Sequence, residues 1–337
     1  MNPISSTADP ATPVRPSEKK PRSDVGLGIG ARDALSISIV WILLIVATFL
    51  VRPDFLSSQT LLAVTFTMSI SGILAVSQGL VVISGGLLDL SLPVALIVGA
   101  WATVTALQAN LPTILAVLAG IVAGAAWGAI NASIVVYGKL TPIIVTLATG
   151  FGGLAVMLIL FKSEQIPSGS ELRSFGLGRL LGLPNVFWPM VVVILLAGLF
   201  VAFTKRGRHL VAVGGNPAAA KARGISLRAT RFGVFMGAGA IAGFAGVMFA
   251  TVNPSFTPAA GANFQLIVIG AVILAGISLS GGKGNFLVLF LSVGFLSTIP
   301  VSIAFFGLPP AFSLVIQGAL LIIAVGIDGF RLKRGSQ

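Results

Sequence analysis

Long apolar stretches alternate with short polar segments along most of this chain. A helix of roughly 20 apolar residues crosses a hydrocarbon core of about 30 Å, and most of the stretches approach that length. The boundaries between 60 and 108 are the hardest to place, because Gly85, Gly86 and Pro93 can each interrupt a helix. The pattern predicts about ten transmembrane helices, near residues 34–51, 60–80, 92–108, 112–137, 142–161, 186–204, 232–252, 264–280, 286–305 and 309–327.

Composition places the chain in the same class. Of the 337 residues, 56% are hydrophobic and 9% are charged, and the mean hydropathy is +1.04. One soluble core cannot hide that much apolar surface, so we predict an all-α polytopic membrane protein in a lipid bilayer. A net charge of +12 suggests nucleic acid when a protein is soluble. Here apolar spans separate the basic residues, so we expect no nucleic-acid partner.

The positions of the basic residues predict an orientation. An even number of spans puts both termini on one side, and with the termini inside, 17 Lys and Arg lie inside and 4 outside. Because Lys and Arg concentrate in cytoplasmic loops, this split favours two cytoplasmic termini. The predicted organisation is a disordered cytosolic tail at 1–33, a transmembrane domain at 34–330 with a cytosolic loop at 205–231, and a basic tail at 331–337.

Residue types needed for metal binding or catalysis are scarce. The chain has no Cys and one His, His209, which excludes a cysteine or histidine metal cluster, so no metal site is expected. The spans offer no convergent acids and no nucleophile with a base, so we predict no catalytic residues and no enzyme. The segment 276–285 fails as a phosphate loop because Gly284 follows Lys283 where a Ser or Thr is required. We interpret this segment as a tight cytosolic turn.

The basic loop 205–231 contains a short helix signal. It has seven Lys or Arg and no acid. Asn216 suits an N-cap, Pro217 suits the first helical position, and Gly224 can close the end. Basic charge alone is typical of any cytoplasmic loop, whereas the capped helix favours docking to a soluble partner. The predicted docking residues are Gly215, Asn216, Pro217, Ala218, Ala219, Ala220, Lys221, Ala222, Arg223 and Gly224.

Polar residues inside the spans are few, which makes each one a candidate. Asp89 is costly in lipid, so it either caps the helix that starts near Pro93 at the interface or faces protein or water. The uncharged candidates either hydrogen-bond between helices or line a polar path, and they are Gln78, Asn131, Gln265 and Gln317.

Glycines at intervals of four predict close helix contacts. Small residues at this spacing let membrane helices approach each other, and packing is the simpler interpretation than a hinge. The residues concerned are Gly120, Gly124 and Gly128 in one stretch, and Gly239 and Gly243 in another.

Several segments resemble the permease subunits of ribose-type ABC sugar importers. The stretch GGNPAAAKARGISLRATRFGVFMGAGAIAGFAGVMFA is similar to the part of that family that contacts the ATPase. The chain departs from the family in GGLLDLSLPV, which has one more Leu before Asp89 and Leu-Pro where Val-Gly is usual. Other similar segments follow in the family order, namely ISGGLLDLS at 83–91, PIIVTLATG at 142–150, GISLSGGKG at 276–284 and AVGID at 324–328.

The resemblance implies a multi-pass permease of the bacterial inner membrane that carries a monosaccharide. Its implied partners are two cytosolic ABC ATPase domains, which bind the ATP and Mg²⁺ that this chain does not, and a second permease copy or sister permease. A periplasmic sugar-binding protein is also implied. The outside loop at 162–185 is the longest and carries both signs of charge, so we expect it to contact that protein through Glu164, Glu171 and Arg173; simple solvation of the loop is the alternative. The alternative from another class is a secondary transporter or channel for a small polar solute, which would normally show more buried acids.

Overall fold

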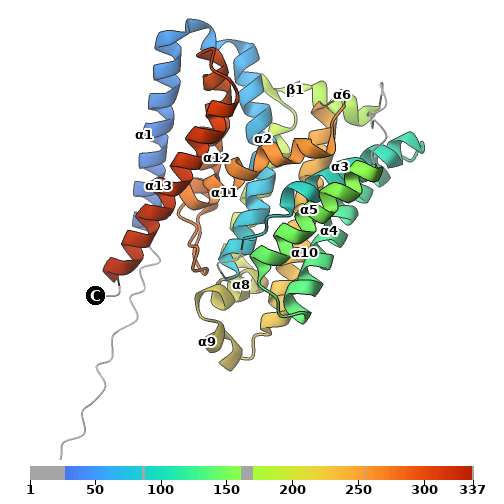
Figure 1. The fold of residues 1–337 in the computed structure, drawn as a ribbon, viewed down its shortest axis with the longest axis vertical. Helices are drawn as coiled ribbons and strands as arrows, with labels where there is room; N and C mark the ends of the chain where they lie inside the picture. The colour runs from blue at the N-terminus through green and yellow to red at the C-terminus, as the bar shows by residue number, and fades with distance from the viewer. Residues whose placement is uncertain (1–26, 86–87, 161–169, 254, 336–337) are drawn as a thin grey trace, which may run out of the picture.

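The computed structural model describes residues 27–85, 88–160, 170–253 and 255–335, and it is almost entirely helical (Figure 1). The prediction of an all-α polytopic membrane protein is confirmed. The longer helices are α1 Leu27–Val51, α2 Ser58–Ile83, α3 Leu92–Gln108, α4 Thr113–Tyr137, α5 Pro142–Leu160, α7 Phe187–Phe203, α8 Lys205–Gly215, α10 Leu227–Val252, α11 Gln265–Leu274, α12 Phe286–Phe305 and α13 Ala311–Gly335. The short elements are η1 Pro53–Leu56, α6 Glu171–Leu177, α9 Pro217–Ala222, η2 Pro258–Phe264 and the antiparallel strands β1 Arg179–Leu180 and β2 Leu183–Pro184.

Each of the ten predicted apolar stretches contains a helix, but the helices differ in length. In the described part of the chain, six are long and apolar enough to cross a membrane. A seventh span results if α7 and α8, which meet at 76°, are counted as one bent span. The apolar helices α3, η2 with α11, and the first part of α13 are shorter. Length therefore supports six or seven complete crossings, and ten stays a prediction.

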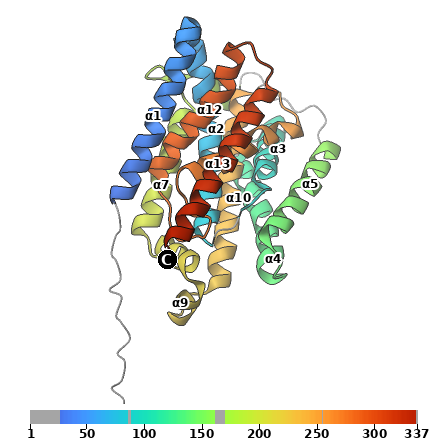
Figure 2. The same cartoon turned by 60° about the vertical axis from the view of Figure 1, so that its left-hand side comes forward.

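The two ends of the bundle carry different elements. The first turn of α1, the last turn of α13 and the pair α8–α9 lie at one end, and α6 and β1 lie at the other (Figures 1 and 2). This arrangement matches the predicted grouping of the basic loop with both ends of the membrane domain. The cytosolic orientation of that end stays a prediction, because the bilayer itself is not part of the structure.

Single cysteines can test this orientation, since the chain has none of its own. Ser174 on α6 and Ala219 on α9 are both exposed and lie at opposite ends. In intact cells, an impermeant thiol reagent is expected to label Ser174→Cys and not Ala219→Cys, and permeabilised cells should label both. Labelling of Ala219→Cys in intact cells would reverse the topology.

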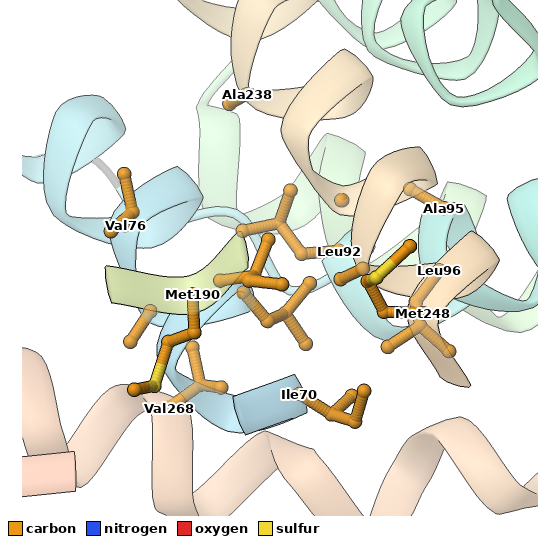
Figure 3. Packing of buried hydrophobic residues seen from close by; sticks show 14 of the residues in the cluster. Ile70, Val76, Leu92, Ala95, Leu96, Met190, Ala238, Met248 and Val268 are labelled. Carbon is orange, nitrogen blue, oxygen red and sulfur yellow. The ribbon is translucent and has the colours of Figure 1, made fainter. Parts of the chain in front are cut away.

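The core forms around α2, which lies at the centre of the bundle. Its residues are buried without interruption from Met68 to Ile83. Side chains from α3, α7, α10 and α11 surround it, as Leu96, Met190, Met248 and Val268 do in Figure 3. Such a helix is apolar on all sides because neighbouring helices cover every face.

The two predicted glycine series pack against each other and join α4 to α10. A Cβ atom on Gly124 would lie 2.6 Å from the Cα atom of Gly243, and one on Gly239 would lie 2.8 Å from the Cα atom of Gly128. Gly120 faces the side chains of Thr103 and Val247 and the carbonyl of Gly99. The neighbouring atoms in the contact between α4 and α10 are mostly backbone, so these helices approach more closely than any side chain would permit.

A break separates α2 from α3 in the region where the sequence boundaries were hardest to place. The Ile83 carbonyl accepts the N–H of Gly282 at 2.8 Å, and α3 begins at Leu92 with Pro93 in its first turn. Pro suits that position because its missing N–H has no helical partner there. Asp89 and Ser91, which directly precede α3, therefore lie in non-helical backbone among buried side chains.

Candidate functional site

The docking helix α9 forms from local signals. The Asn216 side chain accepts the N–H of Ala219 at 3.0 Å, and Pro217 occupies the first helical position. Gly224 follows the helix with φ +78°, a left-handed conformation that costs most other residues roughly 1–2 kcal/mol. The chain then turns into α10, whose N-cap Ser226 accepts the N–H of Ala229. The helix is therefore fixed at both ends by the residues that the sequence analysis named.

Exposure divides the predicted docking residues into two groups. Ala220 is only 3% exposed, and its carbonyl accepts the N–H of Ile225 at 3.0 Å. Ala220, one of the predicted docking residues, is therefore not part of the exposed surface, because it packs into the α9–α10 corner, whereas Ala218, Ala219 and Ala222 are exposed. The exposed surface, called the docking surface below, consists of Gly215, Asn216, Pro217, Ala218, Ala219, Lys221, Ala222, Arg223 and Gly224.

Sequence analysis missed α8, which leads from α7 into the docking helix. Its N-cap Thr204 accepts the N–H of Gly207 at 2.9 Å and is the local signal that could have revealed it. Leu210 and Val213 are buried, whereas Lys205, Arg206 and Arg208 are exposed. Because α8 turns 76° away from α7, its basic face lies across the end of the bundle.

Close contacts made by glycines connect the end of α8, the end of α2 and the 276–285 turn. A Cβ atom on Gly282 would lie 2.6 Å from the Cα atom of Gly215, and one on Gly281 would lie 2.8 Å from the Cα atom of Gly85. Gly214 faces the Ile83 carbonyl closely enough that no side chain fits between them. A displacement of the end of α8 toward α2 or this turn therefore meets backbone directly, with no flexible side chain between.

A buried polar network surrounds the break between α2 and α3. The Asp89 side chain, 2% exposed, accepts hydrogen bonds at Oδ1 from the Ser91 N–H (2.8 Å) and the Ser91 hydroxyl (2.7 Å). The Asn131 amide of α4 donates to the Ser91 oxygen at 2.7 Å, and the Thr149 hydroxyl of α5 donates to the Asn131 oxygen at 2.6 Å. The network thus ties the broken segment to two neighbouring helices.

Gln78 and Trp127 extend this network. With its amide in the orientation that satisfies both groups, Gln78 donates to the Asp89 carbonyl at 2.8 Å and accepts from the Asp89 N–H at 3.2 Å. The Trp127 indole donates to the Ser91 oxygen at 3.2 Å. Asp89 is thus buried in protein, and its carboxylate accepts the N–H of Ser91, the residue directly before α3, rather than an N–H within the first turn of that helix.

Two of the five polar candidates lie elsewhere. Gln265 is at the start of α11, beside a hollow of about 300 Å³ that Leu90 and Pro93 also line. Gln317 on α13 is 4% exposed, and its side-chain amide oxygen Oε1 has no hydrogen-bond partner in the described part of the chain. The structure therefore brings together Gln78, Asp89 and Asn131 and leaves the other two apart.

Replacing Asn131 tests whether the network stabilises the bundle. Asn131→Ala removes one hydrogen-bond partner from the buried Ser91 hydroxyl and one from the half-buried Thr149 hydroxyl, so we expect the free energy of unfolding to fall by about 1–3 kcal/mol. A double-mutant cycle with Thr149→Ala should give a coupling of about 0.6 kcal/mol, the average for interhelical hydrogen bonds in a membrane protein, and at most about 1.7 kcal/mol. Denaturation by SDS in mixed micelles measures both. Ser133→Ala, on the exposed face of the same helix, is the control and should change little. Zero coupling would show that the two helices are joined by other contacts.

At the end of the bundle opposite to α9, residues 170–185 contain α6, β1 and β2, where the sequence predicted a loop. Ser170 caps α6, and the Arg173 guanidinium donates to the Thr251 carbonyl at the end of α10 at 3.1 Å. Glu171 is exposed, so it is available to a partner. Glu164 lies outside the described residues. The Arg173 side chain therefore helps to hold α6 against the end of α10.

Comparisons with known proteins place this helical bundle among transport permeases. Residues 60–325 match the family described as "Branched-chain amino acid transport system / permease component". The match covers most of the chain, and the chain belongs to this family of transport permeases. It is a multi-pass membrane protein of the bacterial inner membrane.

Individual relatives are also similar over most of their length. The ribose import permease protein RbsC of Escherichia coli K12 is 29% identical over 299 residues, which cover 87% of this chain and 92% of RbsC. RbsC of Bacillus subtilis is 28% identical over 289 residues, which cover 85% of this chain and 89% of that protein. The L-arabinose transport system permease protein AraH of E. coli K12 is 29% identical over 308 residues, which cover 89% of this chain and 92% of AraH. No solved structure gives a significant match.

Proposed function

We propose that this chain is the membrane-spanning permease of an ABC importer for a monosaccharide of the ribose or arabinose type. Near-full-length similarity to ribose and arabinose permeases supports the sugar class. The matching family description names branched-chain amino acids instead. The relatives align over about nine tenths of both chains, so a sugar is the better supported substrate.

The docking surface is the observation that carries the transport proposal. A short, capped, basic helix at the end of the bundle offers small residues for close contact, and Lys221 and Arg223 can reach acidic groups around it. Because 276–285 fails as a phosphate loop, ATP and Mg²⁺ are expected in separate ATPase subunits that seat on this surface. Small residues permit the close approach, and the exposed charges set orientation.

Alternating access follows from how the docking surface is connected. Closure of the ATPases around ATP displaces α9, and α9 is continuous with α8 and α10. The close glycine contacts pass this displacement to the end of α2, and the Asp89–Ser91 network carries it on to α4 and α5. Only a partner with different affinity for the two states can drive such a change, and ATP-bound subunits supply that difference.

A binding protein and a second permease complete the proposed importer. The α6 segment lies at the end opposite to α9, which is where an external binding protein would deliver sugar (Figure 1). Glu171 offers an exposed charge there, and together with Glu164 it would set register and encounter rate rather than affinity. The second permease is a copy of this chain or a sister chain, and the translocation path would then lie between the two.

Uptake in a deletion strain tests the proposed substrate class. Cells without this gene are expected to lose uptake of labelled ribose or L-arabinose, and expression of the wild-type chain should restore it. Uptake of labelled leucine serves as the control and should not change. Loss of leucine uptake with both sugars unaffected would overturn the sugar assignment in favour of the amino acids that the family description names.

A further inference from the structure

A long groove runs between α7 and α10 on the outside of the bundle. It encloses about 740 Å³, with Leu80 of α2 among its lining residues and α8 closing its lower end. Along α10 its lining extends from Ser226 to Ile241, which is roughly 22 Å at about 1.5 Å per residue. One leaflet of a bilayer has a hydrocarbon depth of about 15 Å. The groove is therefore long enough to hold an acyl chain.

The groove has a basic end and an apolar wall. Arg206 and His209 of α8 line the lower end, and no acid occurs anywhere in residues 205–231. Further up, the lining side chains are apolar, and two of them face outward, Leu196 at 59% and Met236 at 42% exposed. The wall thus opens toward the lipid that surrounds a membrane protein, while the basic end lies where α8 crosses the end of the bundle.

Two glycines keep the groove open. Gly233 and Gly237 stand four apart on α10 and line the groove, and no atom lies within 4 Å of a Cβ built on either one. Gly239 and Gly243 on the same helix instead lie against α4. The first pair is not needed for the helix contact with α4, and its lack of side chains leaves the space that an occupant can fill.

We propose that this groove binds one anionic phospholipid, with its phosphate at Arg206 and His209 and an acyl chain between α7 and α10. Basic pockets between membrane helices on the cytoplasmic side suit such headgroups. A sugar is a poor occupant of the upper part, because the hydroxyl residues that line the groove, Ser226 and Thr230, lie toward its basic end and the wall above them is apolar. The lipid would set the position of α8, and α8 leads directly into the docking helix. The proposal stands on the groove alone and does not depend on the transported substrate.

The headgroup contact is tested by native mass spectrometry of the purified full-length chain with added phosphatidylglycerol or phosphatidylcholine. The wild type is expected to retain phosphatidylglycerol preferentially. Arg206→Gln should weaken phosphatidylglycerol binding about fivefold, since each basic residue near an anionic headgroup contributes about that factor. Arg208→Gln is the matched control, because it removes the same charge from the same helix without lining the groove. An equal loss in both variants would mean general attraction to a basic surface and would overturn the proposal.

The acyl-chain contact is tested with a phosphatidylglycerol that carries a photoactivatable diazirine in its acyl chain. Crosslinks are expected on α7 and α10 of the wild type. Gly237→Leu extends a side chain into the groove from a Cβ position with no atom within 4 Å, and it should abolish these crosslinks. Gly152→Leu on α5, where a Cβ also meets no atom within 4 Å, should leave them unchanged. Crosslinks spread equally over the exposed faces of α1 and α5, or unaffected by Gly237→Leu, contradict the proposal. Crosslinking of the groove to a second copy of this chain would assign it to a permease interface instead.

Discussion

Gly124→Leu is expected to prevent α4 and α10 from packing, and the variant should not accumulate as a folded protein. A Cβ atom at this position would lie 2.6 Å from the Cα atom of Gly243, well inside the 3.5–4.0 Å at which carbon atoms attract each other. Backbone cannot rotate away as a side chain can, so we place the cost at about 3 kcal/mol, the upper end of overpacking.

Gly152→Leu provides the matched control for this substitution. It introduces the same side chain into α5, where no atom lies within 4 Å of the new Cβ. Size-exclusion profiles of a fluorescent fusion and SDS denaturation measure the two variants. The control should give a monodisperse peak near the wild-type amount. Equal stability of the two variants would show that the α4–α10 contact is looser than the structure has it.

Ala219→Trp is expected to abolish uptake while leaving the protein folded. Ala219 is exposed in the docking surface, so a large side chain is accommodated within this chain but blocks close approach of an ATPase. The variant should accumulate in the membrane at wild-type amounts and lose ATPase co-purification. Ala109 is exposed directly after α3. Ala109→Trp is therefore the control for side-chain bulk and should retain both sugar uptake and ATPase co-purification.

Gly224→Val tests the same surface through the backbone. Val at φ +78° costs roughly 1–2 kcal/mol, because its Cβ crowds the following carbonyl. The strain is expected to turn α9 away from its seat while the membrane core remains intact, so uptake should fall with little change in accumulation. Uptake that remains normal in both Ala219→Trp and Gly224→Val would remove α9 from the ATPase interface.

Local signals allowed α9 to be predicted, and competing signals concealed α8. Asn216, Pro217 and Gly224 act within a few residues, so their pattern is readable without the fold. In α8 the three glycines of KRGRHLVAVGG lower helix propensity, and packing of Leu210 and Val213 overrides them. The cap at Thr204 was the remaining clue.

The sequence alone did not show which distant segments pack against each other. The spacing of Gly124 and Gly128 predicted a close contact, but it did not identify α10 as the partner. Asp89 and Asn131 were recognised as unusual because polar groups are rare in apolar spans, whereas Ser91 and Thr149 are common residue types there and gave no warning. Their convergence depends on the break between α2 and α3, which is a tertiary feature.

Site-specific crosslinking from Ala219 tests the central claim most directly. A cysteine at this position in the naturally Cys-free chain can carry a photoactivatable crosslinker, and a cysteine at Ala109 gives the control from the opposite end. With the complex intact in its membrane, the account predicts crosslinks from position 219 to a subunit that hydrolyses ATP, and none from position 109. Failure to capture an ATP-hydrolysing subunit from position 219, in cells whose sugar uptake through this variant is normal, would contradict it.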